Sequence, residues 1–239
     1  MFVHQTKIQA GLKVMKRLIL MFTILAGISQ ICNAQNNQPK VLLAILIDVS
    51  TSAKDVSNPT DKQLYQLYQV LQKKKVLGTL AIAAIGNTID KNYLRVNLYA
   101  EEVIPAGIRI DKQAEMATSN KNKTYQNHNN VLKWIATFRR NSKEKQPDYS
   151  DVEEMFKKTE QLLSEPAYLN YQKILIFSSD LKNDLGKGQT KWVHSLNKIK
   201  NLTILGLGVY NPIQFNGYNN FFSVQSFDGI NQNIDVIIK

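Results

Sequence analysis

Apolar runs and amphipathic stretches alternate along most of the chain. Residues 41–47 form a continuous apolar run with several β-branched side chains, which is typical of a strand buried on both faces. Residues 94–100 instead alternate apolar and polar side chains, as a half-exposed edge strand does, and we predict that they pair antiparallel with the preceding strand. The pattern predicts further strands at residues 80–85, 173–179, 202–209 and 221–224.

Apolar side chains at helical spacing predict helices between these strands. The first helix follows Thr60, which forms a capping-box pattern with Gln63 and precedes apolar residues on one face. The pattern predicts a second helix over residues 131–138 beginning at Asn129 or Asn130, a third over 152–163 capped by Ser150, and a fourth over 192–199. Residues 230–238 fit either a helix or a strand.

This order of elements predicts an α/β fold. Strands that alternate with helices form a mainly parallel sheet through right-handed crossovers. We therefore expect a doubly wound, mainly parallel central sheet flanked by helices, with one antiparallel edge strand. The 239 residues, of which 44% are hydrophobic, suffice for one sizeable core, and we place the domain at residues 41–239.

Residues 1–34 have the organisation of a signal peptide. Lys16 and Arg17 precede an apolar stretch over residues 18–31, which is too short for an ordinary transmembrane helix. Cys32 and Ala34 place small residues at positions −3 and −1 of a cleavage site before Gln35, and Met15 is an alternative start. We expect a linker at residues 35–40, a secreted or periplasmic location, and no stable membrane span after cleavage.

Two alternatives to cleavage keep the protein attached to a membrane. The first is a lipid anchor on Cys32, although Ile31 and Ser29 depart from the small residue and the leucine that such an anchor sequence favours. The second is an uncleaved signal that stays in the membrane as an anchor. Both alternatives leave the folded part outside the cytoplasm.

Charge and cysteine content exclude several functions. The net charge is +11, and removing the four basic residues before Gln35 leaves 26 basic and 19 acidic side chains, a net charge of +7. This moderate excess is spread over the predicted helix surfaces, which favours solvated faces over a nucleic-acid site. Cys32 is the only cysteine, so the chain forms neither an internal disulfide nor a cysteine-based metal site.

Oxygen-bearing side chains gather where two predicted strands end. Asp48 ends the first strand and is followed by two serines, while Asp180 ends the strand at residues 173–179. The carboxyl ends of parallel strands form the edge of the sheet where ligands bind in α/β folds. The candidate metal ligands are Asp48, Ser50, Ser52, Ser150 and Asp180, with Asp148 as the alternative to Ser150.

The donor types define the kind of cation. All are hard oxygen atoms, which suit Mg²⁺, or Mn²⁺ and Ca²⁺, and which argue against zinc. Mg²⁺ keeps several waters and takes few protein ligands. The alternative interpretation needs no metal: Asp48 caps a turn, and Ser50 and Ser52 form local backbone hydrogen bonds.

The same residues carry a family resemblance. Residues 48–52, with the sequence Asp-Val-Ser-Thr-Ser, are similar to the Asp-x-Ser-x-Ser signature of von Willebrand factor A-type domains. Residues 150–152 resemble the family's second element with Ser in place of Thr, and the strand that ends at Asp180 resembles the third. The resemblance covers residues 41–209 and implies a Rossmann-like fold with a metal-ion-dependent adhesion site. In that site Asp48, Ser50, Ser52 and Ser150 would hold the cation, and Asp180 would orient a bound water.

The resemblance implies a secreted binding module and not an enzyme. An acidic residue of a protein partner would complete the coordination of the cation. Mg²⁺-dependent hydrolases also use aspartates at strand ends, but one such family requires a second aspartate where Ser50 stands, and the sequence has no nucleophile elbow, P-loop or dinucleotide turn. A third alternative is a structural domain with a degenerate metal site.

Overall fold

The structure is a computed structural model, and one compact unit spans residues Pro39–Lys239. The structure describes residues 40–50, 53, 58–85, 93–99, 101–144, 151–181, 194–209 and 212–238. The predicted signal peptide and linker, except Lys40, lie outside these residues. In the described part, no helix has the length and apolar character needed to cross a membrane.

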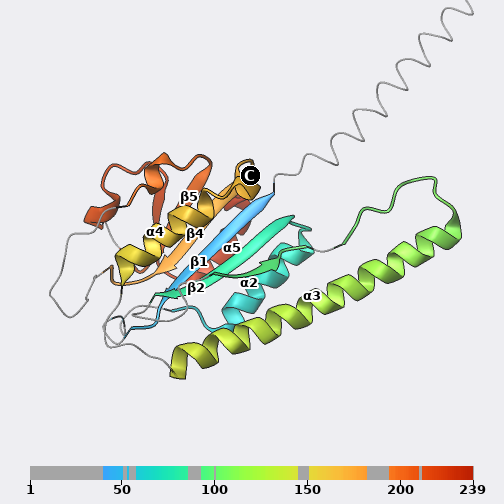
Figure 1. Cartoon of the computed structure of the whole chain (residues 1–239), viewed down its shortest axis with the longest axis horizontal. Coiled ribbons are helices and arrows are strands. Elements are labelled where there is room, and N and C mark those ends of the chain that lie inside the picture. Colours follow the sequence, from blue (N-terminus) through green and yellow to red (C-terminus); the bar gives the residue numbers. More distant parts are fainter. Residues whose placement is uncertain are drawn as a thin grey trace, which may run out of the picture. The chain divides into compact units, whose positions relative to one another are not determined.

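A six-stranded mixed sheet forms the centre of the unit, with the strand order β3-β2-β1-β4-β5-β6 (Figure 1). β1 pairs in parallel with β2 and β4, and the parallel pairing continues through β5 to β6. Only β3, at one edge, runs antiparallel to its neighbour β2. The strands are β1 (Val41–Asp48), β2 (Gly78–Ile85), β3 (Leu94–Asn97), β4 (Gln172–Ser178), β5 (Leu202–Leu207) and β6 (Phe221–Val224). This confirms the α/β class, the mainly parallel sheet and the antiparallel edge strand.

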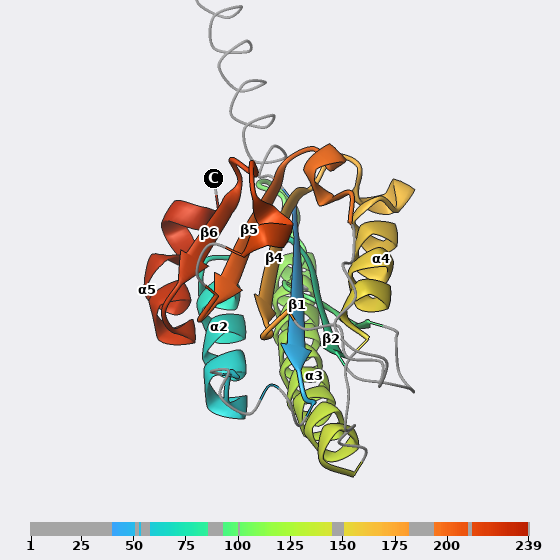
Figure 2. The ribbon, with the colours of Figure 1, turned by 90° about the vertical axis from the view of Figure 1, so that its left-hand side faces the viewer.

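Helices cover both faces of the sheet. α2 (Asp61–Lys73) and α5 (Phe227–Ile237) lie on one side, and α4 (Val152–Leu163) lies on the other (Figure 2). The long helix α3 (Ile110–Glu144) contacts α2 and β3. Three short 3₁₀ turns complete the described elements: η1 (Pro166–Tyr168), η2 (Leu196–Lys198) and η3 (Ile213–Phe215).

The two helical layers explain why the central strands are apolar throughout. Successive residues of a strand point to opposite faces. In β1, Val41, Leu43, Ile45 and Ile47 pack with α2, α3 and α5, whereas Leu42, Ala44 and Leu46 pack with α4. Every residue of β1 is therefore buried, and the polar end of the strand, Asp48, is drawn into the core with it.

Local sequence sets the boundaries of α2 as predicted. The Thr60 side chain accepts from the Gln63 backbone N–H, and the Gln63 side chain accepts from the Thr60 N–H, which completes a capping box. Lys73 in the last turn adds positive charge where the helix dipole favours it. The C-terminal segment, left open between helix and strand, is the helix α5, capped by the Ser226 side chain.

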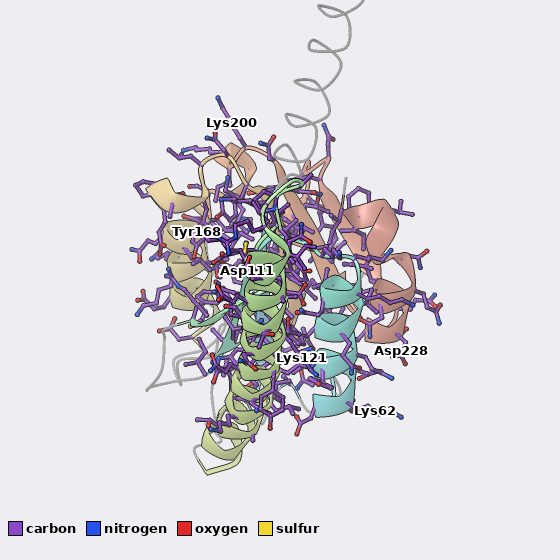
Figure 3. The ribbon with its side chains drawn as sticks, turned by 90° about the vertical axis from the view of Figure 1, so that its right-hand side faces the viewer. Lys62, Asp111, Lys121, Tyr168, Lys200 and Asp228 are labelled. Atoms are coloured by element: carbon purple, nitrogen blue, oxygen red, sulfur yellow. The ribbon has the colours of Figure 1, made fainter. Side chains whose placement is uncertain are left out.

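The predicted start of the second helix at Asn129 or Asn130 is wrong, because α3 is continuous from Ile110 to Glu144. Its first half is polar and rich in asparagine, a poor helix former, so periodicity alone did not show it. The asparagines serve tertiary contacts instead. Asn120 bonds both backbone polar groups of Glu102, and Asn127 donates to the Asn97 carbonyl. Figure 3 shows α3 in front of the sheet beside α2.

β3 and β5 end earlier than predicted, at Asn97 and Leu207, and two helix boundaries also differ. Asp151, not Ser150, is the N-cap of α4, since its carboxylate accepts from the Glu154 backbone N–H at 3.0 Å. Serine and aspartate are both favourable N-cap residues, so the sequence Ser150-Asp151 did not decide which of them caps the helix. The predicted helix over residues 192–199 is the 3₁₀ turn η2 in its described part, while residues 192 and 193 lie outside the described residues.

An aromatic cluster beneath α4 holds His194. The His194 ring lies 4.7 Å from the Phe215 ring and 5.7 Å from the Phe156 ring, centroid to centroid. Its Nδ1 pairs with the Tyr218 hydroxyl at 3.0 Å, and the adjacent Ser195 N–H donates to Glu160. Burial lowers the pKa of His194, against an opposing effect of a backbone hydrogen bond at Gln214.

We predict that His194 makes the fold less stable in acid. Because its folded pKa lies below the unfolded value of 6.5, the unfolded chain binds more protons below that pH. The free energy of unfolding should therefore fall as the pH drops below about 6.5. Urea unfolding between pH 5 and 7 measures this slope, which His194→Gln should flatten. An identical slope in the variant would contradict the assignment.

Candidate functional site

Asp48 is the centre of the candidate site, at the carboxyl end of β1. Asp48 is 0% exposed, although its side chain carries a carboxylate. Burial without hydrogen bonds would cost several kcal/mol. The surroundings of Asp48 therefore decide whether this residue is a structural cap or part of a binding site.

Both carboxylate oxygens of Asp48 accept hydrogen bonds from serine side chains. The Ser50 backbone N–H and hydroxyl donate to Oδ1 at 3.0 and 2.6 Å, and the Ser179 hydroxyl donates to Oδ2 at 2.7 Å. The Ser179 Oγ in turn accepts from the Leu181 N–H at 3.0 Å. Asp48 thus joins the loop after β1 to the loop after β4.

Asn58 adds a second link between the two strands. Its Nδ2 donates to the Asp48 carbonyl at 2.7 Å, and its Oδ1 accepts from the Ser178 hydroxyl at 2.7 Å. The Asn58 amide therefore holds the ends of β1 and β4 together. Asn58 is a positioning residue for this edge of the sheet.

Asp180 brings a second carboxylate to the same edge. Burial, first, and the charge of Asp180 raise the pKa of Asp48, while the hydrogen bonds from Ser179 and Ser50 lower it, and the net direction is upward. Asp180 is half-buried. Two carboxylates that repel each other beside serine hydroxyls are an arrangement that a bound cation would stabilise.

The structure brings together three of the predicted ligands. Asp48, Ser50 and Asp180 lie at the joined ends of β1 and β4. Ser52, Ser150 and the alternative Asp148 lie outside the described residues, so they stay predictions. Within the described ranges there is no group of three or more His, Cys, Asp or Glu side chains able to hold a metal.

Sequence reasoning missed Ser179 and Asn58. Ile47 pairs with Ser178 in the parallel register, which places Ser179 beside Asp48. The predicted strand lengths alone would have aligned Asp48 with Asp180, so the sequence did not show this contact. Asn58 gave no signal either, since it stands ten positions after Asp48 in the sequence.

The donor set fits a small, hard divalent cation. The described side chains are two carboxylates and two serine hydroxyls, with neither nitrogen ligand nor sulfur among these four. Mg²⁺ binds such oxygen atoms with few protein ligands and several waters. A nitrogen- or sulfur-rich zinc site does not match these residues.

We predict that the hydrogen bond from Ser179 to the Asp48 carboxylate contributes more to stability than the hydrogen bond from Ser178 to Asn58. Ser179→Ala removes the donor to a buried carboxylate oxygen and should cost about 2 kcal/mol, whereas Ser178→Ala removes a bond to the neutral Asn58 amide and should cost about 1 kcal/mol. Urea unfolding of both variants measures the difference. Equal losses would show that the Asp48 carboxylate gains nothing particular from Ser179.

The fold and site define an α/β domain with an aspartate–serine cluster at the carboxyl ends of its central strands. No family model matches the chain, and no curated protein matches it. Proximal thread matrix protein 1 from the mussel byssus, in its crystal form 2, is structurally similar, with a TM-score of 0.46 and 14% identity. The match covers 84% of this chain and 48% of that chain, so this protein spans about half the length of the mussel protein.

Proposed function

We propose that this protein is a secreted module that binds a protein partner through a divalent cation, Mg²⁺ or else Mn²⁺ or Ca²⁺. The observation that supports the proposal best is the buried Asp48 carboxylate, held by Ser50 and Ser179 beside Asp180. A turn cap requires one acceptor near the start of the loop. It does not require a second carboxylate and a serine from another strand.

The arrangement of the helices and strands also supports the proposal. Helices on both faces of a mainly parallel sheet agree with a doubly wound, von Willebrand factor A-type arrangement. In this arrangement the chain leaves β1 and β4 at one edge, where the candidate ligands lie. The proposal extends the ligand set to Ser52 and Ser150 from the sequence resemblance.

Each residue has a distinct part in the proposed site. Asp48, Ser50, Ser52 and Ser150 would hold the cation directly or through water, and Asp180 would orient a bound water. The cation would supply an open coordination position for a carboxylate. Asp48 keeps Ser50 in place through the hydroxyl bond at 2.6 Å, and Asn58 holds the Asp48 backbone at 2.7 Å. An acidic residue of the partner would then complete the site.

A manganese titration tests the cation part of the proposal. The electron paramagnetic resonance signal of free Mn²⁺ falls when the ion binds, so it counts the sites. We expect one site per chain, with competition by Mg²⁺ or Ca²⁺, and loss of binding in Asp48→Asn. Mn²⁺ that stays free, or that binds Asp48→Asn equally well, would rule out this site.

A peptide library tests the partner part separately. Each member carries one Asp or Glu, and a matched library carries Asn or Gln at the same position. We expect binding of acidic members in Mg²⁺, loss in EDTA, and no binding of the amide members. A cation site that binds Mn²⁺ but discriminates none of these peptides would leave the ion with a structural role and refute ligand completion.

A further inference from the structure

A hollow lies at the ends of the strands opposite to the candidate metal site. Lys40 precedes β1, Tyr171 precedes β4, and Leu77 precedes β2, whose first two residues also line it, so the hollow adjoins the amino ends of these parallel strands. Seven residue steps along β1 separate this edge from Asp48, which is about 23 Å. The two sites are therefore independent.

The hollow is broad, open to solvent and mainly polar. Its volume is about 600 Å³, within the range of small-molecule sites. Amide, phenol and ammonium groups predominate, Leu77 is the only aliphatic side chain among the described lining residues, and none of these residues is acidic. The polar lining residues are Lys40, Thr79, Asn97, Tyr99, Lys123, Gln126, Asn127, Asn130 and Tyr171.

Asn127 is held in a fixed orientation within this lining. It is 8% exposed, and its Nδ2 donates to the Tyr68 hydroxyl and to the Asn97 carbonyl, both at 2.9 Å. Its Oδ1 makes no hydrogen bond to a described residue. A fixed amide oxygen in a hollow is a ready acceptor for a ligand hydroxyl.

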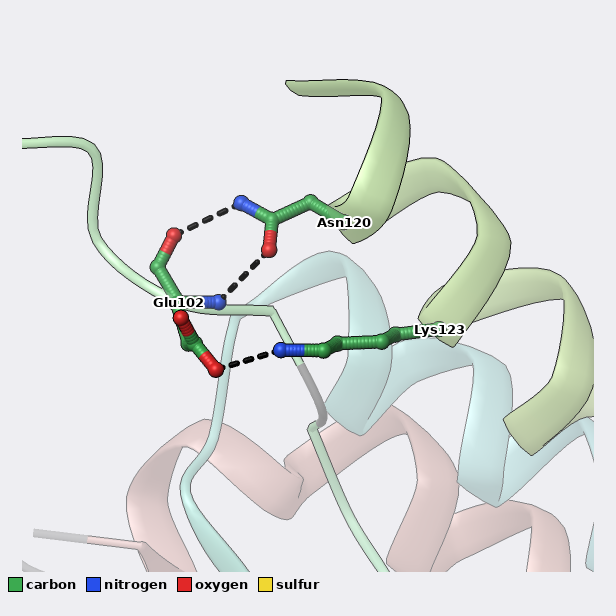
Figure 4. A network of polar contacts seen from close by, with 3 residues as sticks. All are labelled: Glu102, Asn120 and Lys123. Atoms are coloured by element: carbon green, nitrogen blue, oxygen red, sulfur yellow. Dashed lines mark hydrogen bonds and ion pairs between the residues drawn. The ribbon is translucent and has the colours of Figure 1, made fainter. Parts of the chain in front are cut away.

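The two lysines differ in their partners. Lys123 forms an ion pair with the Glu102 carboxylate (Figure 4). Asn120 holds the Glu102 backbone, because its Oδ1 accepts from the Glu102 N–H at 2.9 Å and its Nδ2 donates to the Glu102 carbonyl at 2.7 Å. Lys40 is exposed, lies 5.9 Å from the Tyr171 ring centroid, and forms no ion pair with any described carboxylate. Lys40 is thus the cation in this hollow that remains able to pair with a ligand.

We infer that this hollow binds a saccharide that carries a carboxylate group. Sugar hydroxyls both donate and accept, which matches the amides Asn97, Gln126, Asn127 and Asn130. The C–H faces of a sugar ring pack on tyrosine rings, and Lys40 pairs with the carboxylate. A peptide of the same charge could also pair with the amides, but it would find little apolar surface for its side chains.

Calorimetric titration with the trimer of galacturonic acid tests this inference. The controls are the methyl ester of the same trimer, a glutamate-containing tripeptide, and inorganic phosphate. We expect the acid to bind about tenfold more tightly than the ester, as one charged contact implies, and the tripeptide and phosphate to bind more weakly still. No binding of the acid, or equal binding of the ester or the tripeptide, would overturn the inference.

Two exposed lining residues provide variants that should fold normally. Lys40→Met and Asn130→Ala should each weaken binding of the acid about tenfold. Lys62→Met, which removes a charge from the exposed surface of α2, is the matched control and should bind as the wild type does. Asp48→Asn should also keep saccharide binding. Unchanged affinity in Lys40→Met, or a loss in Asp48→Asn, would contradict a separate carboxylate-binding site.

Discussion

Asp48→Asn is expected to abolish the rise in melting temperature that the proposed cation site predicts for the wild-type protein in Mg²⁺. A ligand that binds only the folded state at one hundred times its Kd stabilises the fold by about 2.7 kcal/mol. For a domain of this size, that corresponds to a shift of roughly 5 to 11 °C. The substitution removes a negative charge from the proposed site while it keeps the shape of the side chain.

The same variant should be no less stable than the wild type in EDTA. Burial and the charge of Asp180 raise the pKa of Asp48, so the ionised form is unfavourable in the cation-free fold, and a neutral amide avoids this cost. The introduced amide oxygen would still accept from Ser50, and its NH₂ group would donate to the Ser179 Oγ, which reverses the direction of that bond. This combination separates loss of a ligand from loss of structure, which Asp48→Ala cannot do.

Thermal melts with EDTA, Mg²⁺, Mn²⁺ and Ca²⁺ provide the measurement. Asp228→Asn is the matched control, because Asp228 lies exposed on α5 and bonds Gln63. It should keep the full cation shift. A wild-type protein that melts at one temperature in all four solutions would refute the cation proposal, and a shift that persists in Asp48→Asn would move the site elsewhere.

Gly78→Ala should destabilise the fold by roughly 3 kcal/mol or more. Gly78 begins β2 with φ at +135°, a conformation that side chains disfavour, and it pairs with Val41. A Cβ at this position would lie 1.9 Å from the Val41 carbonyl oxygen, which belongs to the backbone of a central strand. The strand pair would have to separate to admit a methyl group.

Gly107→Ala is the control for this substitution. Gly107 also has a positive φ, of +84°, but a Cβ there would meet nothing within 4 Å. It should therefore cost only the conformational strain, about 1 to 2 kcal/mol. Urea unfolding of both variants isolates the cost of the steric overlap with Val41. Equal losses of stability would show that β1 and β2 move apart at little cost.

The strands were predictable because buried parallel strands have a simple sequence pattern. β1 is apolar at every position up to Asp48 because helices cover both of its faces. β3 alternates because it is an exposed edge, with only Val96 partly buried among its four residues. The capping box of α2 was equally clear, since both of its side chains lie within four residues.

The remaining features depend on contacts between distant segments. The first half of α3 is helical although its asparagines disfavour this, because Asn120 and Asn127 bond segments that precede the helix. At the site, Asp48 and Asp180 were predictable from strand ends. Ser179 required the register of β1 with β4, and Asn58 required a contact between residues ten positions apart in the sequence.

The two edge strands limit how copies of this protein can associate. β3 and β6 have four residues each, so each edge offers few backbone groups as a template for a strand from another molecule. On β3, the Arg95 guanidinium forms a two-bond contact with Glu165, at 2.7 and 2.6 Å, which places a charged pair at this edge. We expect the folded protein to resist fibril-like aggregation at high concentration, because extension of its sheet would gain little hydrogen bonding.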